Sequence, residues 1–137
     1  MNTKRFLLAW LVVFAFVFLF EMAFHGTIMK GMYQQTASMW RNEADMKSLY
    51  HWIVIGQFLL AGVFCYIFTK GYEGKGTVEG IRYGLLIGIL FAPQNLMLYA
   101  VAPYPVMMIV RWIGGGLMEA ILAGVIVGIV YRPAKTA

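Results

Sequence analysis

Residues 6–29 read FLLAWLVVFAFVFLFEMAFHGTIM, and this apolar run decides the fold class. An α-helix rises about 1.5 Å per residue, so about 20 mainly apolar residues cross the hydrocarbon core of a bilayer. A cleaved signal peptide is the alternative, because Lys4 and Arg5 precede the run. The run is long for a signal core and has no convincing small-residue cleavage site. We therefore expect a retained transmembrane helix.

Three more runs of the same character follow, over about 51–69, 80–100 and 104–131, and glycine and charged residues mark the breaks between them. The 137-residue chain is 61% hydrophobic and 12% charged, whereas about a quarter of the residues in soluble domains are charged. The sequence predicts an all-α integral membrane protein, a four-transmembrane-helix bundle that forms a single domain over residues 1–137.

The connection between the first two runs, residues 32–48, is the longest. Apolar residues recur in it at helical spacing, among them Met32, Tyr33, Ala37 and Trp40, while polar residues fall elsewhere. This pattern predicts an interfacial amphipathic helix. Such a helix is either a lid or docking surface, or a connector that lies on the lipid headgroups, and we favour the connector.

Lysine and arginine at the ends of the runs predict the orientation of the bundle. One side carries seven of them: Lys4, Arg5, Lys70, Lys75, Arg82, Arg132 and Lys135. The other side carries four: Lys30, Arg41, Lys47 and Arg111. The positive-inside rule therefore places both termini in the cytoplasm, and we expect the cell (inner) membrane of a bacterium or archaeon. The net charge of +5 suits orientation and anionic headgroups, so nucleic acid is not an expected partner.

Small residues recur every four positions in the last two runs. They are Gly80, Gly84 and Gly88 in the third run, and Gly116, Ala120, Gly124 and Gly128 in the fourth. Such stripes let helix backbones approach closely within a membrane. We expect the third and fourth helices to pack closely, with a homodimer seam as the alternative.

A short match between residues 57–63 and 119–125 suggests two helical hairpins in parallel repeat. Lys70 and Arg132 close the two segments at the same offset. The match aligns Gln57 with Glu119.

Each of the four runs carries polar residues at a similar depth: Glu21, Gln57, Gln94 with Asn95, and Glu119. At about 1.5 Å of rise per residue, they lie roughly 19–22 Å from the predicted cytoplasmic end. An ionisable residue in the hydrocarbon core is costly, so it faces the bundle interior or a partner and marks a functional site by default. The sequence therefore predicts a polar layer that can bind an ion or ligand.

Two further residues belong to this predicted site. His25 lies four residues after Glu21, so both side chains lie on one helix face, where they can share a proton or a metal ion. Arg111 precedes Glu119 by two turns, and its long side chain can reach the carboxylates or the headgroups. A metal ion is the weaker hypothesis, because Glu21, His25 and Glu119 match no known metal-ligand spacing.

The chain lacks the usual signals of an enzyme. It has no phosphate-binding glycine loop in a strand–helix context, no nucleophile with a neighbouring base and no Cys-x-x-Cys-His haem attachment. Its one cysteine, Cys65, excludes an intrachain disulfide. We expect neither enzymatic activity nor a cofactor.

The size, the four apolar runs and an acidic residue in the first run are similar in outline to small multidrug-resistance exporters. That resemblance implies transport. The chain departs from that family in the position of Glu21, in its second acid Glu119 and in its longer first connection, so no residue role is carried over.

Two interpretations of function stay open. In the first, the protein is a small proton- or cation-coupled transporter or channel that acts as an oligomer, with the polar layer as its site. In the second, it is a non-catalytic accessory or scaffold subunit of a larger membrane complex, and the polar layer is a structural hydrogen-bond network. The expected partners are the lipid bilayer and further copies of the chain or other membrane subunits.

Overall fold

The protein folds into four long helices joined by short connections, in a computed structural model that describes residues 1–132. The elements are α1 (Thr3–Ala23), the π-helix η1 (Phe24–Ile28), α2 (Lys30–Gln35), the 3-10 helix η2 (Ala37–Met39), α3 (Glu43–Lys70), α4 (Thr77–Val101) and α5 (Val106–Val130). No strand occurs among the described residues. Four segments, Thr3–Ile28, Glu43–Lys70, Thr77–Val101 and Val106–Val130, are long and apolar enough to cross a membrane. The prediction of an all-helical chain with four such helices is confirmed.

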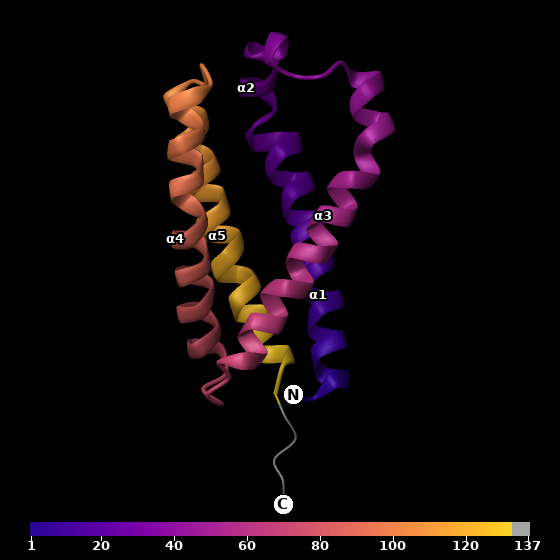
Figure 1. Cartoon of the computed structure of the whole chain (residues 1–137), viewed down its shortest axis with the longest axis vertical. Helices are drawn as coiled ribbons and strands as arrows, with labels where there is room; N and C mark the ends of the chain where they lie inside the picture. Colours follow the sequence, from indigo (N-terminus) through magenta and orange to yellow (C-terminus); the bar gives the residue numbers. More distant parts are fainter. Residues whose placement is uncertain (133–137) are drawn as a thin grey trace, which may run out of the picture.

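The long helices run alternately up and down, so both ends of the described chain lie at the same end of the bundle (Figure 1). We call this the terminal end, and the opposite end the α2 end. Helices α4 and α5 lie side by side along their length, whereas α1 and α3 cross and diverge toward the α2 end (Figure 1). The hairpin of α1 and α3 thus packs differently from the hairpin of α4 and α5. The parallel repeat of two hairpins stays a prediction. Lys135, which contributes to the predicted orientation, lies outside the described residues.

The predicted amphipathic helix over 32–48 is wrong as a single helix. The chain forms only α2 and η2 there, turns extended at Trp40, and begins α3 at Glu43. The cause is a local cap: the Asn42 side chain accepts the backbone N–H of Asp45 at 2.9 Å. Acidic residues in the first turn, Glu43 and Asp45, add favourable charge at this helix N-terminus. The second apolar helix therefore begins eight residues before the predicted run at 51.

Glycine determines the close approach of α4 and α5. A Cβ added at Gly84 would lie 2.8 Å from the Cα of Ile121, and one added at Gly124 would lie 3.0 Å from the Cα of Gly84. Gly80 and Gly88 likewise face backbone or Cα atoms of α5. These two helices could not approach so closely with larger residues at these positions. The predicted close packing of the third and fourth helices is confirmed within one chain.

The stripe in α5 differs from the prediction at one position. An added Cβ at Gly116 would meet nothing within 4 Å, whereas one at the neighbouring Gly115 would lie 2.6 Å from Cε2 of Phe24. Gly115 thus makes room for the first ring of the π-helix. Neighbouring residues of a helix point about 100° apart, so Gly115 and Gly116 face different directions. The α5 positions that face α4 are Ala120, Gly124 and Gly128, whereas Gly115 faces Phe24 of η1.

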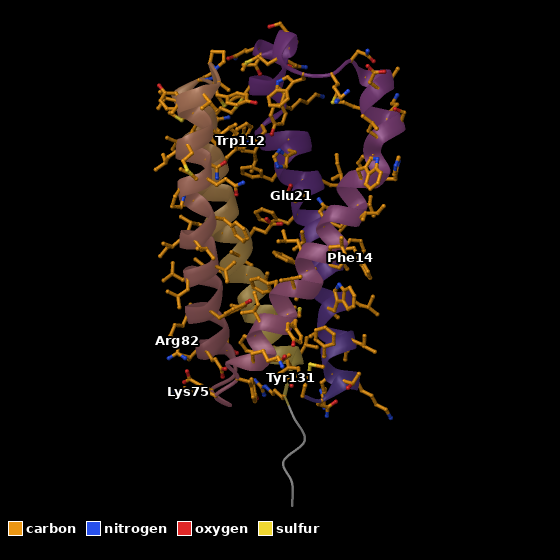
Figure 2. The ribbon with its side chains drawn as sticks, viewed as in Figure 1. Phe14, Glu21, Lys75, Arg82, Trp112 and Tyr131 are labelled. Carbon is orange, nitrogen blue, oxygen red and sulfur yellow. The ribbon has the colours of Figure 1, made fainter. Side chains whose placement is uncertain are left out.

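The terminal end is held by a carboxylate that the sequence reading did not single out. Glu79, 3% exposed in the first turn of α4, accepts the backbone N–H groups of Glu73 at 2.6 Å and Lys75 at 2.9 Å. It thereby orders the connection between α3 and α4. Glu73 also pairs with Lys75 at 2.6 Å and with Arg82, and Figure 2 shows Lys75 and Arg82 together at this end.

Candidate intramembrane polar site

Two acidic side chains meet inside the bundle. Glu21 lies in the last turn of α1 and Glu119 lies midway along α5, and α1 packs against α5. The two carboxyl groups lie near enough to each other for their charges to interact. The Oε1 atom of Glu119 is buried and has no hydrogen-bond donor among the described residues. Acids among apolar helices are costly to bury, so the pair is a candidate site for a proton or a cation.

The π-helix extends this pair toward the α2 end. His25 lies in η1, and its Nε2 is 3.1 Å from Oε2 of Glu21. Its Nδ1 is hydrogen-bonded to the hydroxyl of Tyr33 in α2, and the two rings stack with centroids 5.7 Å apart. π-Helical turns are rare and are frequent at functional sites. Here the π-helical turn places His25 between Glu21 of α1 and Tyr33 of α2.

Trp112 adds a donor to the hydrogen bond between His25 and Tyr33. Trp112 Nε1 donates to the Tyr33 hydroxyl at 3.0 Å, and an indole nitrogen can only donate. The Tyr33 hydroxyl is free to donate its own proton to His25 Nδ1 when the proton of the ring lies on Nε2, and Nε2 then donates to Glu21. Glu21, His25 and Tyr33 thus form one polar chain with Glu119 beside Glu21, and Glu21 and Trp112 appear in the α2 half of Figure 2.

Burial keeps Tyr33 in its protonated form. Desolvation raises the pKa of Tyr33, the hydrogen bond from Trp112 opposes that rise, and the negative charge of Glu21 adds to it. Trp40 packs edge-on against Tyr33, with ring centroids 5.3 Å apart, and its Nε1 donates to Thr36 at 2.9 Å. The end of the polar chain is therefore a neutral hydroxyl fixed in an aromatic cluster.

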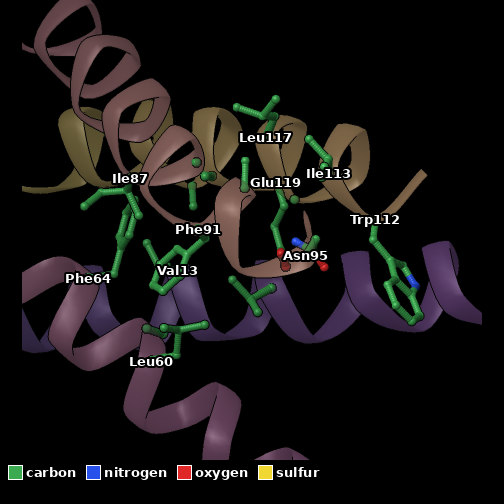
Figure 3. Close-up of a pocket in the computed structure, with 17 residues that line it drawn as sticks. Val13, Leu60, Phe64, Ile87, Phe91, Asn95, Trp112, Ile113, Leu117 and Glu119 are labelled. Atoms are coloured by element: carbon green, nitrogen blue, oxygen red, sulfur yellow. The ribbon is translucent and has the colours of Figure 1, made fainter. Parts of the chain in front are cut away.

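The acid pair lies between two cavities. One, of about 300 Å³, lies between α1 and the α2-end half of α3, and Glu21, His25 and Gln57 are among its lining residues. The other, of about 220 Å³, is lined by all four long helices, and its polar residues include Glu119 and Asn95. Figure 3 shows Glu119 and Asn95 directed to the same part of this second cavity. The Oε1 atom of Gln57 is also buried without a donor among the described residues.

Two predicted site residues lie elsewhere. Gln94 is exposed on the outside of α4, while the next residue, Asn95, turns toward the cavity. Arg111 is exposed, and its Nη1 donates to the backbone carbonyl of Ile28 at 3.1 Å. That carbonyl ends the π-helix and has no further helical turn to bond with. Arg111 makes no ion pair with either acid in the part of the chain that the structure describes.

Sequence reasoning missed Tyr33 and Trp112. Tyr33 was counted among the apolar residues of the connection and Trp112 was not singled out, because a tyrosine or tryptophan near a membrane surface is ordinary. The available signal was that each has a polar group that needs a partner when buried. Among residues 1–132, no three His, Cys, Asp or Glu side chains lie close enough together to hold a metal ion.

Comparisons of this chain with protein-family models, with curated proteins and with solved structures found no match.

Proposed function

We propose that the protein is a small integral membrane transporter or channel that couples to protons or cations through the Glu21–Glu119 pair. The observation that carries the proposal is the polar chain from Glu21 through His25 to Tyr33, with the second acid, Glu119, beside Glu21. A purely structural network would need only neutral hydrogen-bonding groups, whereas acids in an apolar bundle are expensive and mark ion or proton pathways by default. Both termini are proposed to lie in the cytoplasm of a bacterial or archaeal cell, so that Tyr33 lies toward the outside.

The chain has the parts that a proton relay requires. The acid pair can hold a proton, His25 can accept one on a ring nitrogen, and the Tyr33 hydroxyl can pass one on. The relay ends beside the first connection, where Gln34 and Gln35 are exposed. The 300 Å³ cavity beside Glu21, His25 and Gln57 gives water or a cation a second approach to the same pair.

An oligomer is part of this proposal. Gln94 stands exposed in the apolar outer face of α4, and a lipid-facing amide has no hydrogen-bond partner. Its amide can donate and accept, so a second copy related by a two-fold axis can satisfy it.

The accessory-subunit alternative draws on α3. Its α2-end half carries exposed Trp52, Ile53 and Ile55 and diverges from α1 (Figure 1), which would suit another membrane subunit. It predicts that the acids can be replaced by amides without functional loss, provided that the hydrogen bonds survive.

Flux measurements in liposomes test the proposal. The purified protein is reconstituted around a pH dye, and proton movement is followed under an imposed proton or cation gradient for wild type, Glu21→Gln and Glu119→Gln. Glu43→Gln is the matched control, because Glu43 is an exposed acid whose ion pair within residues 1–132 is with Lys47 alone. We expect flux in wild type and the control and background flux in both site variants. Wild-type flux in Glu21→Gln and Glu119→Gln, or no flux in wild type across a broad cation panel, would refute the proposal.

A further inference from the structure

The connection between α3 and α4 forms a basic pocket at the terminal end of the bundle. The pocket has a volume of about 660 Å³ and is lined by residues 72 and 74–78 together with Arg132. Its two charged lining side chains, Lys75 and Arg132, are both basic, and no acidic side chain among residues 1–132 lines it. The complementary ligand is therefore an anion, and a guanidinium binds phosphate oxygens with two parallel hydrogen bonds.

The acidic residues near the pocket already have partners. Glu79 is buried, and its two carboxylate oxygens accept backbone N–H groups of the connection. Glu73 pairs with both Lys75 and Arg82, which lie together at this end (Figure 2). Arg132 makes no ion pair within residues 1–132. The basic groups around the pocket thus outnumber the carboxylates that are available to pair with them.

Glycine allows the Arg132 guanidinium to lie against the connection. Gly76 has a φ of +61°, a region that favours glycine. A Cβ built on Gly76 would lie 3.5 Å from Nη2 of Arg132, so the guanidinium rests on the backbone at the start of α4. The pocket is therefore assembled from two segments far apart in the sequence, the α3–α4 connection and the end of α5.

The position of the pocket favours a lipid over a free anion. It lies where α3 ends, α4 begins and α5 ends, and all three helices are long and apolar enough to cross a membrane. Lipid headgroups surround a membrane protein at this level. Val78 lines the pocket, and Val78, Ile81 and Leu85 are exposed and lie along one face of α4. An acyl chain can lie along this face while its phosphate lies in the pocket.

We propose that this pocket binds the headgroup phosphate of an anionic glycerophospholipid. Arg132 donates hydrogen bonds to the phosphate, Lys75 supplies the second positive charge, and one acyl chain lies along Val78, Ile81 and Leu85. The bound lipid joins the start of α4 to the end of α5. This inference does not rest on the proposed function, because the lipid binds at the terminal end whether or not protons cross the bundle.

Native mass spectrometry of the full-length, delipidated protein in detergent micelles measures the binding. The protein is titrated with dioleoylphosphatidylglycerol and with dioleoylphosphatidylcholine, which share their acyl chains and differ in net charge. Each basic side chain at a membrane surface strengthens the binding of an anionic lipid about fivefold. With two such side chains in the pocket, the first phosphatidylglycerol should bind at least about tenfold more tightly than phosphatidylcholine. An excess of sn-glycerol 3-phosphate, which has the phosphate but no acyl chains, should not displace it.

Two variants locate the lipid. Arg132→Gln removes the guanidinium, and Thr77→Asp adds a negative charge to a lining position in the first turn of α4, where an acid is compatible with the helix. Each should weaken phosphatidylglycerol binding about fivefold and leave phosphatidylcholine binding unchanged. The matched controls make the same charge changes at the same end but outside the pocket. They are Arg5→Gln and Asn2→Asp, the latter keeping an acceptor for the backbone N–H of Arg5. Both should bind phosphatidylglycerol within about twofold of wild type.

The proposal is overturned if phosphatidylcholine binds as tightly as phosphatidylglycerol, or if either Arg132→Gln or Thr77→Asp binds phosphatidylglycerol like wild type. It is also overturned if the controls weaken binding as much as the pocket variants, which would indicate a diffuse attraction to the whole basic end. Displacement by sn-glycerol 3-phosphate would mean that the pocket takes a free phosphate and would overturn the lipid assignment. None of these outcomes changes the flux expected of Glu21→Gln and Glu119→Gln, so this proposal and the proposed function fail separately.

Discussion

Replacement of Gly84 by alanine should separate α4 from α5. The added Cβ would lie 2.8 Å from the Cα of Ile121 and closer still to the carbonyl oxygen of Ala120. Carbon atoms pack at about 3.5–4.0 Å, so the contact is at least about 0.7 Å too short. The obstructing atoms belong to the backbone of α5, which cannot swing aside as a side chain can. One of the two helices must therefore move along this whole stretch.

The cost is that of overpacking a dense interface, about 1–3 kcal/mol and at the upper end here. Gly114→Ala is the matched control, because its added Cβ would meet nothing within 4 Å. Alanine is about 1 kcal/mol more favourable than glycine in a helix, so Gly114→Ala should be neutral or stabilising. The propensity gain is common to both variants and cancels, so the difference in unfolding free energy between them should be the overpacking cost, about 1–3 kcal/mol.

Reversible unfolding in mixed micelles, followed by circular dichroism, measures that difference. Gly84→Ala should unfold at lower denaturant and Gly114→Ala at the wild-type value or above it. Equal stability of the two variants would refute the reasoning, because it would mean that α4 and α5 do not touch at Gly84.

Three further predictions concern the two ends of the bundle. Tyr33→Phe removes the hydroxyl between Trp112 and His25. Thermal melting should show an unfolding free energy lower by about 1–2 kcal/mol, and the liposome assay should show a lower proton flux. Unchanged flux would exclude Tyr33 from the relay. Glu79→Gln retains one acceptor oxygen for two backbone N–H groups, so it should lower the melting temperature, whereas Gln35→Glu, at an exposed position, should not. Lys75 and Arg82 lower the pKa of Glu73 from its ordinary 4.5; its stabilising contribution is therefore full above that pH and is lost as the pH falls through the lowered value. Melting curves from pH 6 to pH 3 should show less acid sensitivity in Glu73→Gln than in wild type, and parallel curves would contradict this.

Local sequence patterns were sufficient for the helices themselves. Runs of about 20 apolar residues have few alternatives to a helix, because each backbone polar group is satisfied within the segment. The glycine spacing in α4 likewise predicted a close helix contact. The exception was the connection over 32–48, where apolar periodicity suggested one helix but the Asn42 cap divides it. Capping is a local signal, and the Asn-Glu-x-Asp pattern was present in the sequence.

The candidate site could be predicted only in part. The i, i+4 spacing of Glu21 and His25 follows from helix geometry and is confirmed by the contact between them. The choice between Gln94 and Asn95 depends on the rotation of α4 about its axis, which its packing on α5 determines. The partner of Arg111 depends on the π-helix, which ends at Ile28.

The sequence by itself determined that this chain has four apolar helices, acids within two of them and glycines where two helices meet, because these properties depend on neighbouring residues. Only the tertiary structure decided that Glu21 meets Glu119 and that His25 meets Tyr33. The Glu21–Glu119 contact joins residues nearly a hundred positions apart, and it depends on how α1 and α5 are rotated and shifted against each other. Many small packing contacts determine that arrangement together, and no single stretch of sequence contains them.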